Sequence, residues 1–183
     1  MCTITKHLEI RFAKRAAYDQ LAHFHYRSSC PAVYAAIYAM YDTSGWHGLS
    51  KAWPWGMGGM ARRERSDRGH VQGWQPPKVD GFYERTQKPV GVIVYTMPVI
   101  GLEVRNIAIG EMFECCQNRK ERMKMINENI RCISRVIIEP RYRGLGLAAR
   151  LVRETMPLLN VPIIEAMAVM GQVNPFFEKA GMT

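Results

Sequence analysis

The sequence lacks several features that would place it in a specialised structural class. It has no run of about 18 or more apolar residues, so we expect no transmembrane helix and no membrane partner. Its N-terminus has no apolar core of the kind found in secretory signals. The five cysteines are odd in number, and Cys115 and Cys116 are adjacent, which argues against a disulfide framework. These absences predict reduced thiols and a cytoplasmic protein.

Metal-binding patterns and internal repeats are also missing. No cysteine or histidine spacing matches that of a zinc site, so we predict no metal centre. His23 and His25 would share a face on a strand, where such a pair could bind a metal, but core or surface positions are the favoured interpretation.

Acidic residues are few relative to basic ones. The chain has 25 lysines and arginines against 16 aspartates and glutamates, a net charge of +9. This balance favours acidic partners, such as nucleic acid, an anionic cofactor or an acidic protein surface. A basic surface without a binding role is the alternative.

Enough apolar sequence is present for one sizeable core. With 183 residues, of which 48% are hydrophobic, we predict a single domain over 1–183. The periodicities predict an α/β fold. Strands are predicted over 32–42, 88–99, 102–110, 131–139 and 161–170. Helices are predicted over 14–26, 115–130, 146–159 and 174–182. The range 32–42 is also compatible with a buried helix, but its β-branched and aromatic residues favour a strand.

Residues 42–88 differ in character from the rest of the chain. They contain all four tryptophans and many glycines, and they show no periodicity. Such long segments inside a domain are usually functional or disordered, and tryptophans tend to be buried. We interpret 42–88 as an inserted loop of the lid type. Its arginine-rich part, 62–74, ends at Trp74 and suits contact with nucleic acid, while a solvated loop is the alternative.

The stretch IIEPRYRGLGLAARL, Ile137 to Leu151, joins a predicted strand to a predicted helix. The first N–H groups of a helix are unpaired and partly positive, and glycine lets a ligand approach them closely. Two arginines add bidentate donors. The stretch therefore predicts an anion site suited to phosphate, with a plain turn as the alternative. It lacks the Lys-Ser/Thr ending of a triphosphate loop and the third glycine of a dinucleotide turn.

This R-x-x-G-x-G turn resembles the pyrophosphate loop of the GNAT superfamily of acyl-CoA-dependent N-acyltransferases. The resemblance implies acetyl-CoA as cofactor, with CoA as product, held by backbone N–H groups of the turn. The implied cofactor-binding residues are Arg141, Arg143, Gly144, Leu145, Gly146 and Leu147.

Two further segments extend the resemblance. The range 174–182 is similar to a late helix of the family, and 88–98 is similar to its central hairpin strand. The similarity covers about residues 88–183. It implies a GNAT-like mixed central sheet flanked by helices, with 42–88 as a long inserted loop and the final strand of the fold missing after residue 183.

The implied reaction moves an acetyl or similar acyl group from coenzyme A to an amine acceptor by direct attack. Backbone amides near Val136 and Ile137 would polarise the thioester carbonyl. Glu165, a lone acid in an apolar strand, is the candidate general base, and an ion pair with an arginine such as Arg135 is the alternative. Weaker candidates for the base are Glu111, Glu114 and Glu139.

The chain departs from the family pattern at the position of the thiolate's proton donor. Phe177 stands where many members have a tyrosine. Either Tyr142, Tyr95 or the Ser134 hydroxyl donates instead, or the thiolate leaves without a proton donor, or the reaction is not ordinary acetyl transfer. Asn174 is also closer to this aromatic than the pattern expects.

Two alternative functions stay open. The stretch HYRSSCP resembles the phage Mom proteins, GNAT-like enzymes that modify adenine in DNA, and His25 and Tyr26 match a histidine–tyrosine pair there. A non-catalytic nucleic-acid-binding module on the same fold is the second alternative.

Overall fold

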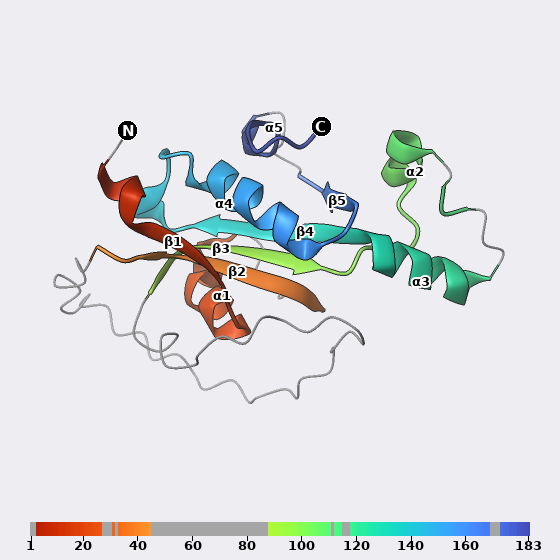
Figure 1. Cartoon of the computed structure of the whole chain (residues 1–183), viewed down its shortest axis with the longest axis horizontal. Coiled ribbons are helices and arrows are strands. Elements are labelled where there is room, and N and C mark those ends of the chain that lie inside the picture. The colour runs from red at the N-terminus through yellow and green to blue at the C-terminus, as the bar shows by residue number, and fades with distance from the viewer. Residues whose placement is uncertain are drawn as a thin grey trace.

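Five strands form one mixed sheet (Figure 1). The computed structural model describes residues 3–26, 31, 33–44, 88–110, 112–114, 118–168 and 173–183. The strands are β1 (Leu8–Phe12), β2 (Tyr34–Asp42), β3 (Pro89–Thr96), β4 (Ile130–Ile138) and β5 (Ile163–Ala166). Their order in the sheet follows the chain. The first three ladders are antiparallel, and β4 pairs with β5 in parallel.

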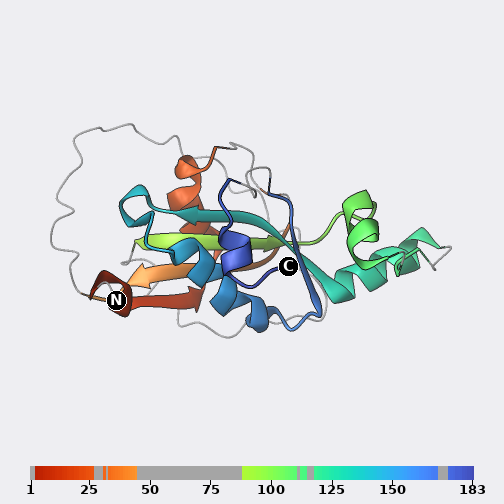
Figure 2. The same cartoon turned by 90° about the horizontal axis from the view of Figure 1, so that it is seen from above.

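Helices lie on both faces of the sheet and at one end of it. They are α1 (Arg15–Leu21), α2 (Glu103–Ile109), α3 (Arg119–Asn129), α4 (Leu147–Thr155) and α5 (Phe176–Lys179). Shorter 3-10 turns are η1 (Thr3–His7), η2 (Ala22–Phe24), η5 (Pro140–Tyr142) and η6 (Met156–Leu159). Helix α1 covers one face, α4 and α5 cover the other, and α2 and α3 project from the end (Figures 1 and 2). The predicted α/β class, a mixed sheet flanked by helices, is confirmed.

Strand β3 is buried at every position from Pro89 to Tyr95. Its side chains alternate between two apolar clusters, with Ile93 on the α4 side and Val92 on the α1 side. A strand that is covered on both faces must be apolar throughout, which explains the unbroken apolar run in the sequence.

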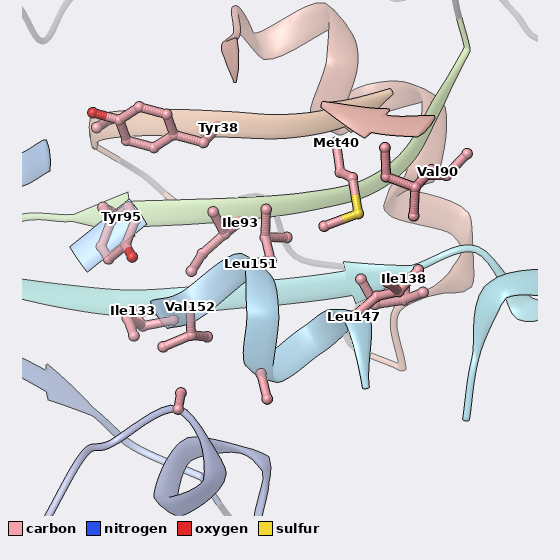
Figure 3. Close-up of a cluster of buried hydrophobic side chains, with 14 of the residues drawn as sticks. Tyr38, Met40, Val90, Ile93, Tyr95, Ile133, Ile138, Leu147, Leu151 and Val152 are labelled. Carbon is pink, nitrogen blue, oxygen red and sulfur yellow. The ribbon is translucent and has the colours of Figure 1, made fainter. Parts of the chain in front are cut away.

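Helix α4 packs across β3 and β4 (Figure 3). Leu147 lies beside Ile138 and Val152 beside Ile133, and all four side chains are buried. Full burial of such a side chain contributes roughly 1.5–3 kcal/mol, so this contact fixes the start of α4 against the end of β4.

Arg150 reaches from α4 to the N-terminal segment. Its Nη1 and Nη2 donate to the carbonyl oxygens of Thr5 and Leu8, at 2.9 and 3.1 Å. Its Nε pairs with Glu154 one turn further along the helix. These bonds tie the start of β1 to α4.

The prediction of a strand over 102–110 is wrong. The segment forms α2, which ends at Gly110 with φ of 70°. Its β-branched residues favour a strand locally, but helical spacing turns Arg105 inward and leaves Val104 and Ile107 exposed. Because Arg105 then bonds a distant carboxylate and two carbonyl groups, tertiary contacts outweigh the local preference.

The remaining predicted elements agree with the structure in type. Strand β5 is shorter than predicted, with four residues, and α3 corresponds to the described part of the helix predicted over 115–130. Strand β1 is an addition that the sequence analysis missed, because a five-residue edge strand carrying Glu9 and Arg11 has little apolar signal. Residues 45–87, which make up nearly all of the predicted inserted loop, lie outside the part of the chain that the structure describes.

A hydrogen bond lies within the apolar core between β3 and α4. The hydroxyl oxygens of Tyr95 and Thr155 are 2.7 Å apart, and both residues are fully buried. Thr155 donates its proton to the carbonyl oxygen of Leu151, so Tyr95 donates to Thr155. Burial raises the pKa of Tyr95, and this hydroxyl therefore belongs to the core rather than to a reaction site.

We expect Thr155→Val to destabilise the fold by about 1–3 kcal/mol, because it leaves the Tyr95 hydroxyl buried without its acceptor. Adding Tyr95→Phe removes the stranded hydroxyl and should restore part of the loss. Urea unfolding of the two single variants and the double variant measures both effects. A double variant less stable than Thr155→Val alone would contradict the assigned bond.

Candidate functional site

Strands β4 and β5 separate halfway along β4. Their parallel pairing runs from Ile130 opposite Ile163 to Ile133 opposite Ala166. Among the described residues, the second half of β4, residues 134–138, pairs with β3 alone. We call the side of this half that faces away from β3 the open edge of β4. A β-bulge at Ser134 marks the point of separation, since Arg135 pairs with Val94 and Ile133 with Tyr95.

The backbone of β4 directs particular N–H groups to the open edge. The N–H of Glu139 donates to the carbonyl oxygen of Val90 on β3, at 2.9 Å. Successive N–H groups of a strand point to opposite edges. The N–H groups of Val136 and Ile138 therefore face the open edge, and that of Ile137 faces β3. Of the two predicted amides, the structure favours Val136.

The glycine turn, residues 141–146, follows directly from this strand. Gly144 and Gly146 have φ of 81° and 74°, a left-handed conformation that disfavours other residues. A Cβ at either position would meet nothing within 4 Å, so the space in front of the turn is open. Gly146 is the N-cap of α4 and supplies no side-chain cap, which leaves the first N–H groups of the helix, including that of Leu147, available to a ligand.

The two arginines of the turn bond to nearby protein oxygens. Arg141 pairs with Glu139, with Nε to Oε1 at 2.7 Å, and its side chain is 76% exposed. Arg143 donates from Nε to the carbonyl oxygen of Ile138 at 3.1 Å. Each arginine uses only part of its guanidinium group in these bonds and both side chains are exposed, so the turn offers arginine N–H groups as well as backbone N–H groups. Leu145 is also exposed.

Tyr142 and Ser134 lie apart from each other. The Tyr142 hydroxyl donates to Asp42 at the end of β2, 3.0 Å away, and burial together with Asp42 raises the pKa of Tyr142. This bond holds the glycine turn to β2, on the side away from β5. Ser134 occupies the bulge, where its hydroxyl accepts a bond from Arg135 Nη1 at 3.3 Å. Of the two, only Ser134 lies at the open edge.

Glu165 forms a bidentate ion pair, but with Arg105 of α2 rather than with Arg135. Its two carboxylate oxygens accept from Nε and Nη2 of Arg105, each at 2.8 Å. The Glu165 side chain is 15% exposed and the Arg105 side chain is 4% exposed. A carboxylate with both oxygens engaged is poorly placed to take a proton from a substrate, so the structure favours the ion-pair alternative.

The other predicted acids are also paired or lie outside the described residues. Glu114 accepts bonds from Arg122 and Asn106, and Glu139 pairs with Arg141. Glu111 lies outside the part of the chain that the structure describes.

The rings of His25 and Tyr26 stack with centroids 4.6 Å apart and an interplanar angle of 28°. The Tyr26 side chain is largely exposed. The preceding turn, η2, lies against β4. Within the described residues, no three histidine, cysteine, aspartate or glutamate side chains gather where they could hold a metal ion.

Phe177 packs beside Phe176 against the α4 cluster, with ring centroids 4.1 Å apart. It therefore supplies packing where the family pattern expects a hydroxyl. Asn174 is exposed, and its carbonyl oxygen accepts from the N–H of Phe176.

The residue that sequence reasoning missed is Arg105. Its only sequence signal is that it is the one basic residue between Pro98 and Gly110, a stretch otherwise rich in apolar residues, just as Glu165 is a lone acid in its strand. The bulge at Ser134 has no visible sequence signal.

Comparison of the sequence with protein-family models and with curated proteins finds no match. In the parts of the chain that the structure describes, no helix is both long and apolar enough to span a membrane. The functional assignment consequently depends on the geometry of the glycine turn and the open edge of β4.

Cys132 lies opposite Glu165 in the β4–β5 ladder and is half-buried. Burial raises the pKa of its thiol to about 11, and the Glu165 carboxylate adds to the rise. We expect its alkylation by iodoacetamide to speed up about tenfold for each pH unit from 8 to 10, without a plateau, because only the thiolate reacts. Mass spectrometry resolved to this residue measures the rate, with the urea-unfolded chain as control. A plateau below pH 9.5 in the folded protein would contradict the raised pKa.

Proposed function

We propose that this protein is a GNAT-type N-acyltransferase that moves an acyl group from coenzyme A to an amine. The observation that carries the proposal is the continuity of two features on one strand. The open edge of β4 runs without interruption into a glycine turn whose left-handed residues and open front suit an anion. Neither feature is needed for a plain strand–helix connection.

The residues of the turn fit a pyrophosphate group. The N–H groups between Gly144 and Leu147 would donate to it, and the partial positive charge at the start of α4 favours an anion. Glycine at 144 and 146 removes the side chains that would block the approach. Arg141 and Arg143 add positive potential near the turn, while they also bond Glu139 and the carbonyl oxygen of Ile138.

A bound acyl-CoA supplies an activated carbonyl carbon for attack by an amine. The N–H of Val136 would donate to the carbonyl oxygen as that oxygen gains negative charge. The attacking amine loses one proton and the departing sulfur gains one, so no further reactant is needed. Ser134, at the bulge beside this edge, is the favoured hydroxyl for the sulfur.

Because Arg105 engages both carboxylate oxygens of Glu165, another residue would serve as the general base. His25 is the histidine predicted from the sequence to take part, and it follows η2, which lies against β4. We therefore propose His25 as the base in place of Glu165.

A DNA-modifying enzyme of the Mom type is the second candidate. The observation that favours it is the His25–Tyr26 stack with its exposed tyrosine, because an exposed aromatic ring can stack on a nucleic-acid base. The acceptor would then be an adenine amine. The other alternative, binding through 62–74, concerns residues outside those described.

We expect Gly146→Trp to weaken CoA binding at least tenfold in calorimetric titration, because the new side chain fills the front of the turn. Gly110→Trp is a stringent control. Gly110 has equally open surroundings at the end of α2, away from the turn, and its φ of 70° with ψ of −175° is nearly restricted to glycine, so tryptophan is strained there at least as much as at Gly146.

A charge-reversed variant, Arg141→Glu with Arg143→Glu, should also lose affinity for CoA while it leaves the glycines intact. Undiminished CoA affinity in both turn variants, or an equal loss in the Gly110 control, would refute this assignment of the turn.

A further inference from the structure

Arg105 is a buried arginine whose guanidinium group makes four hydrogen bonds. Its Nε and Nη2 donate to Glu165, its Nη2 also donates to the carbonyl oxygen of Val99 at 2.8 Å, and its Nη1 donates to that of Ile100 at 3.3 Å. One guanidinium group therefore joins α2, the segment after β3 and strand β5. Burying an ion pair carries a large desolvation cost, which these bonds offset.

The ion pair lies where β4 and β5 separate. Glu165 is the second-last residue of β5 and stands opposite Cys132, and the next pair, Ile133 with Ala166, is the last of the ladder. Only one residue of β4, Ile133, therefore separates the position opposite Glu165 from Ser134, the bulge residue at which the open edge of β4 begins.

The Arg105 end of the ion pair belongs to α2, which packs against an apolar cluster. This cluster joins α2, α3 and the starts of β4 and β5, and its buried members are Phe113, Ile126 and Ile130. Ile109 of α2 and Ile163 of β5 pack against this cluster. Arg105 therefore ties the end of β5 to a packed unit that also contains the first pair of the β4–β5 ladder, Ile130 and Ile163.

Unpaired backbone groups at a strand edge favour the addition of a neighbouring strand. Met167 and Ala168 follow β5 and lie outside its ladder with β4, and in an extended ladder they would cover the N–H of Val136. We propose that Arg105 is a positioning residue that fixes the end of β5, so that the ladder with β4 stops at Ala166 and this N–H stays accessible to the acyl-CoA. This inference rests on the proposed function.

The test separates the two halves of coenzyme A. We expect Arg105→Met to weaken binding of CoA at least tenfold in calorimetric titration, because the pantetheine part lies along the open edge. Binding of 3′-phospho-ADP, the nucleotide half, should change less than twofold, because the glycine turn is intact. A general loss of structure would weaken both ligands together. Unchanged CoA affinity, or an equal loss for both ligands, would overturn the proposal.

Arg122→Met is the matched control, because Arg122 is a partly buried arginine of α3 that pairs with Glu114 and does not bond β5. It should leave both affinities within twofold. If Arg105→Met does not fold, Arg105→Lys serves instead, because lysine keeps the charge and loses the bidentate geometry. The lysine variant is expected to give the same split between the two ligands.

Amide hydrogen exchange tests the role of Arg105 without any ligand. Replacing Arg105 should speed exchange at least tenfold in residues 163–166 and leave β3 unchanged, while Arg122→Met should not. If wild-type protein binds neither CoA nor 3′-phospho-ADP, the proposed function fails, and exchange alone then decides whether Arg105 positions β5. Unaltered exchange in 163–166 would refute that role.

Discussion

The ladder between β3 and β4 is the constraint on which the rest of the structure depends. Strand β3 is buried on both faces, and Gly91 permits its close contact with β4, since a Cβ there would lie 2.7 Å from Ile138 Cδ1. The bond from Glu139 to Val90 ends this ladder and fixes where the glycine turn begins. The same bond determines, by alternation, which N–H groups of β4 face away from β3.

The charged side chains that the sequence pattern marks as candidate site residues also bond to other parts of the protein. The arginines of the glycine turn bond to the carboxylate of Glu139 and the carbonyl of Ile138 through part of their guanidinium groups, and the N–H groups at the start of α4 add backbone donors suited to an anion. The lone acid of β5, Glu165, is held by Arg105 at the end of the β4–β5 ladder. Several side chains that look reactive in the sequence thus also stabilise the backbone of the candidate site.

Elements governed by local sequence could be predicted. The glycine turn and α4 follow from left-handed glycines and an amphipathic run, and β3 follows from its unbroken apolar stretch. Helix α2 could not be predicted, because its conformation depends on a bond between Arg105 and a glutamate 60 residues away. For the same reason the sequence alone could not identify Arg105 as the partner of Glu165. The bulge at Ser134 arises from the register of two strands, which leaves no local signature.

The bonds from Arg150 to Thr5 and Leu8 have a consequence for how the chain folds. They join groups that are 145 and 142 residues apart in sequence. During synthesis β1 leaves the ribosome well before α4, the helix that anchors its start. Contacts of such large sequence separation slow folding, because the chain must close a long loop before they form. The N-terminal strand is therefore expected to complete its docking among the last steps of folding.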